Sequence, residues 1–279
     1  IGDMANKGVE LELNYIPVNK KNFTWKINLN LTHYKNKITY LPDEKKTTVM
    51  DGHGGYMNGS RYYGEDLPIN TWYMKRFAGL SEDGLSLWYY TDKETNEEKT
   101  TTTYSTGDFY LCGDPNPDLY GGFGTSITFH GFDLSTQFSY LVGGLTYDYG
   151  YAGMMGNPTA TSVGNRWHKD VLKAWSPENP SSTIPRWYFN DLNTTGSSDR
   201  FLIDGSYLNL QNIQVGYTLP DSWTSHLKIK NLRLYFVCDN VYYWSKRKGL
   251  DPRRSISGVG TSGKIAPFRT YSGGISLQF

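Results

Sequence analysis

Three oxygen-bearing side chains alternate along one short segment: Asp114, Asn116 and Asp118. Alternating oxygen ligands are typical of calcium loops, which also need a glutamate at a fixed distance downstream. No glutamate stands there, and a proline separates each of these residues from the next. Because proline, aspartate and asparagine favour tight turns, we interpret the segment as a rigid turn.

Three further carboxylates, Glu178, Asp191 and Asp199, are candidates for hydrolytic chemistry. Glycoside hydrolysis needs two carboxyl groups at a defined separation, which a sequence does not give. Nothing in the spacing of these residues ties any two of them together. We therefore predict no catalytic residues, and we expect that the protein is not an enzyme.

The chain contains two cysteines, Cys112 and Cys238, which lie far apart in the sequence. They form no CxxC motif, and the five histidines are scattered without the spacing of metal ligands. We expect two unreactive thiols, no bound metal and no cofactor.

Aromatic residues make up 15% of the chain, with 23 tyrosines and 8 tryptophans. Sugar rings stack on such side chains, while neighbouring polar groups bind the hydroxyls. Aromatic residues also form girdles at membrane interfaces, pack loops together or contact partner proteins. Those on or beside long connecting segments are our candidates for substrate contact: Tyr62, Tyr63, Trp72, Trp167, Trp175, Trp187 and Tyr188.

The elements that would position these residues are strands. Residues 23–33 alternate between apolar side chains, beginning with Phe23, Trp25 and Ile27, and polar ones, beginning with Thr24 and Lys26. The run is about as long as a tilted strand that crosses a bilayer. The chain contains no apolar run of the roughly 18 residues that a membrane helix needs, so any crossing must use strands. The formal net charge of +1 offers no basic field for nucleic acid.

The last segment of the chain has the same pattern. Tyr271, Gly273, Ile275, Leu277 and Phe279 share one face, and the residues between them are small or polar. Alternation that continues to the final residue indicates a strand paired in a sheet, because free tails usually fray. An outer-membrane β-barrel ends in this way.

The pattern predicts an all-β fold with about nine antiparallel strands. These are residues 7–15, 23–34, 71–79, 85–91, 119–129, 132–148, 201–217, 231–242 and 268–279. Short connectors alternate with long ones, as the periplasmic turns and extracellular loops of outer-membrane barrels do. The short connectors are 16–22, 81–84, 130–131 and 219–230. An odd strand number cannot close a bacterial barrel, so we expect a larger barrel whose N-terminal part covers the open edges.

Several motifs resemble one family of outer-membrane transporters. The longest comprises residues 200–208 (RFLIDGSYL), 212–213 (NI) and 216–220 (GYTLP). Further matches are residues 6–11 (NKGVEL), 113–118 (GDPNPD), 120–124 (YGGFG), 231–235 (NLRLY) and 248–252 (KGLDP). Together they resemble the SusC-like (SusC/RagA) TonB-dependent transporters, from near the start of the chain to its last residue.

This resemblance implies a fold and a function. It implies that residues 1–279 are the C-terminal part of a 22-stranded transmembrane barrel, whose plug domain and N-terminal strands are absent from this chain. It further implies import of glycans or peptides through the outer membrane of a Gram-negative, Bacteroidetes-like bacterium. The implied partners are a SusD-like surface lipoprotein that sits on the barrel as a lid and the TonB complex. In outer-membrane proteins generally, the final strand is a signal for barrel assembly, here Tyr271, Ile275, Leu277 and Phe279.

Two positions depart from the family's pattern. Arg253 stands where the family often has glutamate, and Asn209 where it often has lysine. We expect these differences to change loop contacts and to leave the fold intact. The alternative to a transporter wall is a soluble, aromatic-rich β-sandwich at the cell surface that binds or hydrolyses glycans. The terminal strand favours the barrel.

Overall fold

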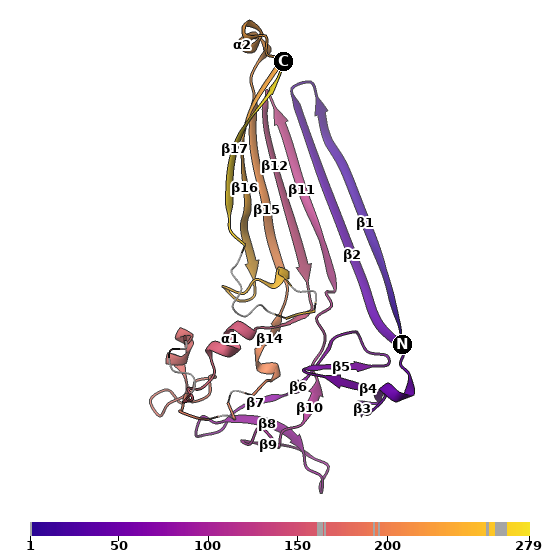
Figure 1. The fold of residues 1–279 in the computed structure, drawn as a ribbon, viewed down its shortest axis with the longest axis vertical. Helices are drawn as coiled ribbons and strands as arrows, with labels where there is room; N and C mark the ends of the chain where they lie inside the picture. The colour runs from indigo at the N-terminus through magenta and orange to yellow at the C-terminus, as the bar shows by residue number, and fades with distance from the viewer. Residues whose placement is uncertain are drawn as a thin grey trace.

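The computed structural model describes residues 2–160, 164, 166–191, 193–194, 196–254, 257–259 and 267–279. Seven long antiparallel strands form one tall curved sheet, the wall, with most of the rest of the chain gathered at one end (Figure 1). In spatial order, the wall strands are β1 (Asp3–Lys20), β2 (Phe23–Tyr40), β11 (Leu119–Phe129), β12 (Phe132–Val142), β15 (Tyr207–Thr218), β16 (Asn231–Ser245) and β17 (Thr270–Gln278). The all-β prediction is confirmed.

The two faces of the wall differ in chemistry because side chains alternate along each strand. One face carries large apolar residues that remain exposed, among them Leu11, Val215 and Ile275. The other carries polar residues such as Asn28 and Gln137, whose side chains are hydrogen-bonded to each other at 3.5 Å. No helix in the described part of the chain is long and apolar enough to cross a membrane.

The wall has a turn end and a loop end. At the turn end, β1 joins β2 through residues 21–22, β11 joins β12 through 130–131, and β15 joins β16 through 219–230. His130 and Gly131 both have positive φ, 48° and 86°, which suits the tightest hairpins because it matches the strand twist. The 219–230 turn contains α2 (Asp221–Thr224) and η4 (Ser225–Leu227).

At the loop end, the described residues of 41–118, 143–206 and 246–269 fold together, and we name them the loop module. Its three small sheets contain β3 (Thr48–Met50), β4 (His53–Asn58), β5 (Arg61–Gly64), β6 (Thr71–Lys75), β7 (Phe77–Leu80), β8 (Ser86–Thr91), β9 (Glu98–Thr101), β10 (Phe109–Leu111), β13 (Leu145–Tyr147) and β14 (Leu202–Asp204). Its helices are η1 (Asp43–Lys45), α1 (Tyr149–Met154), η2 (Lys169–Lys173), η3 (Asp199–Phe201) and η5 (Pro252–Arg254).

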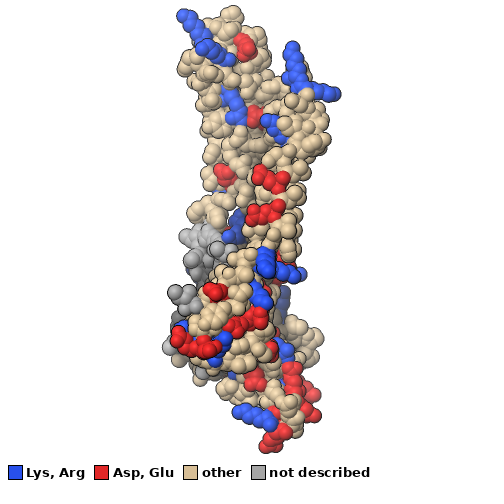
Figure 2. Space-filling model, turned by 90° about the vertical axis from the view of Figure 1, so that its right-hand side faces the viewer, with Lys and Arg blue, Asp and Glu red and all other residues tan. Residues whose placement is uncertain are grey.

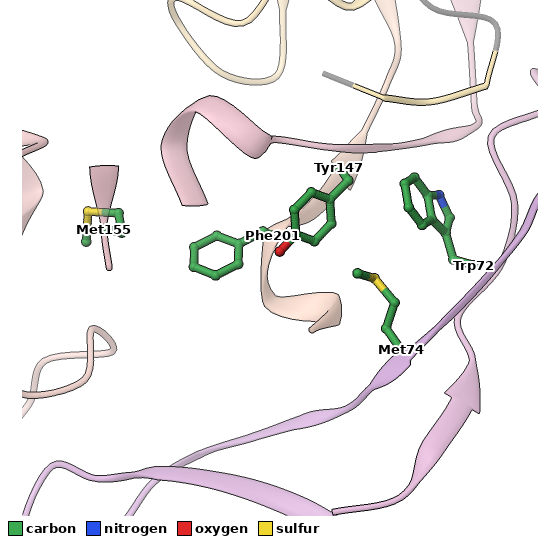
Figure 3. Packing of buried hydrophobic residues seen from close by; sticks show 5 residues of the cluster. All are labelled: Trp72, Met74, Tyr147, Met155 and Phe201. Carbon is green, nitrogen blue, oxygen red and sulfur yellow. The ribbon is translucent and has the colours of Figure 1, made fainter. Parts of the chain in front are cut away.

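The loop module has its own apolar core. Trp72, Met74, Tyr147, Met155 and Phe201 are all buried, and they come from two different loops (Figure 3). The Trp72 indole donates to the Leu145 carbonyl at 3.1 Å, and the Tyr147 amide donates to the Gly258 carbonyl at 2.8 Å. These bonds tie all three loops into one unit.

Two of the nine predicted strands do not belong to the wall. Residues 71–79 and 85–91 form β6, β7 and β8 of the loop module, so the wall has seven strands and residues 81–84 are a turn within the module. These strands have four to six residues, too few to cross a membrane, and β6 is buried along its whole length. The prediction was wrong because alternation over so few residues does not distinguish a wall strand from a core strand.

Other wall strands differ from the prediction in their bounds. Strand β1 continues past the predicted turn at 16–22, because Pro17 lies at a bulge on this edge strand, where its missing N–H is tolerated. The predicted strand 132–148 breaks at Gly143 and Gly144, which have φ of 82° and 72°. The reversal at these glycines separates β12 from β13 of the loop module.

Candidate functional site

A cavity of about 1100 Å³ lies where the polar face of the wall meets the loop module. Its lining is rich in amide and phenol groups, namely Asn6, Tyr34, Asn36, Asn70, Asn116 and Tyr120. Strands β1, β2 and β11 contribute part of this set, and the loop module contributes the rest. Glu10 is the only carboxylate in the described lining. Such a lining can exchange hydrogen bonds with hydroxyl or peptide groups while carrying little charge.

Asn36 fixes the wall side of the cavity. Its amide nitrogen donates to Asn6 Oδ1 at 2.7 Å, and its Oδ1 accepts from the Ile69 backbone amide at 2.7 Å. One buried side chain therefore connects β1, β2 and the loop module. Because its described hydrogen bonds lie within the protein, Asn36 holds the shape of the cavity, and its neighbours are better placed for ligand contact.

Asn116 belongs to the turn that the sequence predicts. Its backbone and side-chain amides both donate to Asp114 Oδ1, at 2.9 and 2.7 Å. This Asx-type turn confirms the interpretation of the segment as a turn. The Asp118 carbonyl lies 2.5 Å from Nδ1 of His33 on β2, so the turn is anchored to the wall beside the cavity.

Two of the predicted substrate-contact residues lie inside the loop module. Tyr62 and Trp72 are 0% exposed. The Tyr62 hydroxyl lies 2.8 Å from the carbonyls of Thr48 and His53, and the Arg61 guanidinium stacks on the Trp72 ring. Burial also lowers the pKa of Arg61 to about 10. In this structure neither aromatic ring has a face accessible to a ligand, because other residues of the loop module pack against both rings.

The other predicted aromatics are at least partly accessible. Trp187 and Tyr188 are 40% and 62% exposed, and Trp187 packs edge-to-face against the half-buried Trp167. The Trp187 indole donates to the Gly156 carbonyl at 3.2 Å, which fixes its orientation. Trp167 and Trp187 therefore form an aromatic pair on the second loop, and Tyr188 follows Trp187 in the chain.

Trp175 and Tyr63 lie apart from that pair. Trp175 packs on Gly84, where an added Cβ would lie 2.3 Å from the indole. Tyr63 stacks on Tyr56, with ring centroids 5.2 Å apart, and its hydroxyl donates to Asn70 Oδ1 at 2.9 Å. None of the predicted aromatics lines the cavity, although Tyr63 reaches it through Asn70.

The three carboxylates considered for hydrolysis have local structural partners. Asp199 accepts from the Phe77 amide at 2.8 Å, and burial raises the pKa of its carboxyl. Asp191 accepts from the Asn193 amide at 3.2 Å. The Glu178 carboxyl has a lowered pKa through a hydrogen bond with Ser176. None of these contacts joins one carboxylate to another.

The comparisons with known proteins agree with this architecture. No family model matches the chain. TonB-dependent receptor P3 of Formosa agariphila is 28% identical over the whole chain, and TonB-dependent receptor SusC of Bacteroides thetaiotaomicron is 26% identical over the whole chain. The chain spans less than a third of the length of these curated relatives, 29% and 27%.

Solved structures show the same fold. The RagAB peptide transporter superimposes on the whole chain with a TM-score of 0.81 at 24% identity, and the chain covers 30% of it. The RagAB peptide importer in its open-open state gives a TM-score of 0.79 at 25% identity, with 29% of that chain covered. The chain is therefore similar to SusC in sequence and to RagAB in fold. In such a transmembrane barrel, the apolar face of the wall contacts lipid and the polar face lines the lumen.

The two positions that depart from the SusC-like pattern are in direct contact. Arg253 Nη1 donates to Asn209 Oδ1 at 2.6 Å. The same guanidinium forms a bidentate pair with Asp251 and stacks on the Tyr243 ring. The sequence alone predicted altered loop contacts, and the structure shows that both changes meet at one contact between β15 and the third loop.

The four residues of the predicted assembly signal lie on the lipid-facing side of β17. Tyr271, Ile275, Leu277 and Phe279 are all exposed, Phe279 by 73%. Leu277 and Ile275 pair with Leu232 and Leu234 of β16, which continue the apolar face. The predicted alternation is confirmed, and the role of these residues in assembly remains a prediction.

Proposed function

We propose that this chain is part of the wall of an outer-membrane transporter that imports oligosaccharides or peptides. The observation that carries the proposal is the wall itself, which is apolar and exposed on one face and polar on the other. Its similarity to TonB-dependent receptors and to RagAB supports the same function.

The structure does not favour the β-sandwich alternative. A sandwich buries the apolar face of one sheet against a second sheet about 10 Å away. Here no described residue covers the apolar face of the wall, and its large side chains remain exposed. The named relatives are receptors and importers, so we assign selective passage without covalent chemistry to this chain.

We further propose the partners that the resemblance implies. A SusD-like surface lipoprotein would sit over the loop module, and the TonB complex would supply energy through a plug domain elsewhere in the same protein. This assignment places the loop end outside the cell and the turn end in the periplasm, as expected from the lengths of loops and turns in outer-membrane barrels.

We propose two groups of cargo contacts. The first is the cavity lining, where Tyr120 presents its phenol beside Tyr34, with ring centroids 6.0 Å apart. The second is the aromatics of the loop module that are at least partly accessible: Tyr63, Trp167, Trp175, Trp187 and Tyr188. Tyr62 and Trp72 are excluded from this proposal because they are buried.

The cavity is tested in the full-length transporter with its lipoprotein. We expect Tyr120→Ala to weaken cargo binding by about fivefold or more, since one aromatic contact contributes roughly 1 kcal/mol beyond its area. Tyr242→Ala is the matched control, because Tyr242 is exposed on the lipid-facing side of β16. Equal binding and growth on the cargo for both variants would count against this site.

A further inference from the structure

Four lysines at the turn end of the wall have no anionic partner within the described residues. Lys20 and Lys21 lie at the β1–β2 turn, and Lys228 and Lys230 lie between η4 and β16. All four are exposed, and none takes part in an ion pair of the described chain. Figure 2 shows basic side chains projecting from this end of the molecule.

The distribution of ion pairs differs between the two ends. The described ion pairs lie at the loop end, as in Lys46–Glu65, with one exception close to the turn end, Asp133–Arg233, in which the two charges cancel. Among the residues of the three turns, Asp221 is the only carboxylate. The turn end therefore carries excess positive charge that the described chain does not neutralise.

An exposed tryptophan lies beside this charge. Trp223 on α2 is 65% exposed, while its neighbour Thr224 is buried and accepts the Ile229 amide at its carbonyl, 3.3 Å away. Phe129, Phe132 and Phe279 are exposed at the same end, on the apolar face. Indole and phenyl rings at the end of membrane strands favour the headgroup level, where lysines contact phosphates.

We propose that the turn end binds anionic phospholipid headgroups of the adjacent leaflet through Lys20, Lys21, Lys228 and Lys230, with Trp223 inserted into the same headgroup layer. The inference rests on the proposed function, which places the wall in a membrane. The neighbouring aromatic residues favour a lipid surface over an acidic protein segment. A contact with a water-soluble protein would not need Phe129, Phe132 and Phe279 to be exposed at the same end of the wall.

The test uses the full-length transporter in nanodiscs that contain equal parts of phosphatidylcholine and phosphatidylglycerol. Native mass spectrometry counts the lipids of each class that stay bound. We expect the wild type to retain phosphatidylglycerol preferentially. In Lys228→Gln/Lys230→Gln, the ratio of bound phosphatidylglycerol to bound phosphatidylcholine should fall about fivefold for each lysine removed. The control, Lys93→Gln/Lys169→Gln, removes two exposed lysines of the loop module and should keep the preference.

A second measurement reports on Trp223. Brominated lipids should quench the tryptophan emission of the wild type more than that of Trp223→Phe, with heat-modifiable mobility as the check that both are folded. Equal quenching overturns the insertion of Trp223. Equal lipid ratios in the wild type and the Lys228→Gln/Lys230→Gln variant overturn the lysine site.

The alternative partner gives a different result. A wild type that ignores lipid charge but captures a polyglutamate peptide in low salt would overturn the proposal in favour of an acidic protein. Lipid retention is measured without cargo, so a transporter that fails to import but keeps its lipid preference would contradict the proposed function alone.

Discussion

The guanidinium of Arg233 reaches the carboxylate of Asp133 across an intervening strand. Nη2 lies 2.6 Å from Oδ1, and Nε lies 3.0 Å from Oδ2. Arg233 is on β16 and Asp133 is on β12, and the strand between them, β15, passes beneath the pair at Gly216. A Cβ at Gly216 would lie 2.3 Å from Asp133 Oδ2 and 2.5 Å from Arg233 Nη2, so the glycine makes room for the contact. Asn28 and Gln137 meet over Gly124 of β11 in the same way.

We expect Gly216→Ala to break the Asp133–Arg233 pair and to destabilise the wall. The loss should be about 1–2 kcal/mol, between the values for exposed and buried ion pairs, because both side chains are about a quarter exposed. The measurement is the urea midpoint of the folded barrel in detergent. Gly273→Ala is the control, since an added Cβ there meets only the Tyr235 carbonyl at 3.9 Å. Equal midpoints for the two variants would refute the role of Gly216.

The contact between Arg253 and Asn209 predicts that a second substitution at Asn209 rescues the effect of a charge reversal at Arg253. Arg253→Glu alone should loosen the third loop for two reasons. The new carboxylate would face the like charge of Asp251, and it could not donate the hydrogen bond that Arg253 donates to Asn209 Oδ1. Adding Asn209→Lys should restore the contact as a salt bridge. Thermolysin cleavage of the loop, followed by mass spectrometry, should be several times faster in the single variant and close to wild type in the double. No rescue would mean that the two positions act independently.

The β8–β9 hairpin should depend on pH through Asp92. The Lys99 ammonium, 2.5 Å away, and the amides of Glu94 and Thr95 hold the pKa of the Asp92 carboxyl at about 2. Because this value lies below the ordinary pKa of about 3.9, the stabilising contribution is complete above that pH and is lost as the pH falls towards 2. Protection factors from hydrogen exchange across the hairpin should decrease over that interval.

Two variants separate the Asp92 effect from general acid unfolding. Asp92→Asn should lower protection at neutral pH and remove the decrease between pH 4 and 2. Glu94→Gln changes a neighbouring exposed carboxylate that makes no described ion pair, so it should leave the profile unchanged. A profile in Asp92→Asn that follows the wild type would show that another group titrates.

Truncation of Trp72 should affect stability, whereas truncation of Trp187 should affect cargo binding. Trp72→Ala removes a fully buried ring from the core of the loop module and should cost about 3–5 kcal/mol of stability. Trp187→Ala removes a partly exposed ring, so we expect little change in stability and weaker cargo binding. Calorimetry of the full-length protein and titration of cargo onto the complex measure the two effects. Unchanged affinity in both Trp187→Ala and Trp175→Ala would remove the loop aromatics from the proposed site.

The wall was predictable from sequence because each of its strands is long and has one lipid-facing side. Strand β11 has the predicted bounds, and the alternation of β17 is the one that the sequence indicates. A pattern that repeats over about ten residues leaves few other interpretations. The β6 and β8 strands, by contrast, combine apolar residues on both faces with short length, and only the folded loop module shows that they form a core.

The cavity could not be predicted for a different reason. Its amides come from positions 6, 36, 70 and 116, which become neighbours only after β1, β2 and two parts of one loop have come together. A usable signal did exist in the alternating polar residues near the end of β2, where Thr32, Tyr34 and Asn36 line the cavity. The aromatic residues were predicted to contact substrate instead. Tyr62 and Trp72 are buried, because large rings also serve to pack a core.

The hydrogen bonds that join Trp72 to Leu145 and Tyr147 to Gly258 have a thermodynamic consequence for capture. Long surface loops that move independently lose conformational entropy when a ligand orders them, and this loss weakens binding. In this protein two of the loops share a core, and the described residues of the third are tied to it by a backbone hydrogen bond, so these residues lose much of that entropy during folding. We therefore expect the described part of the loop module to present a surface whose shape is set beforehand, so that the affinity of any ligand for it depends on the contacts themselves.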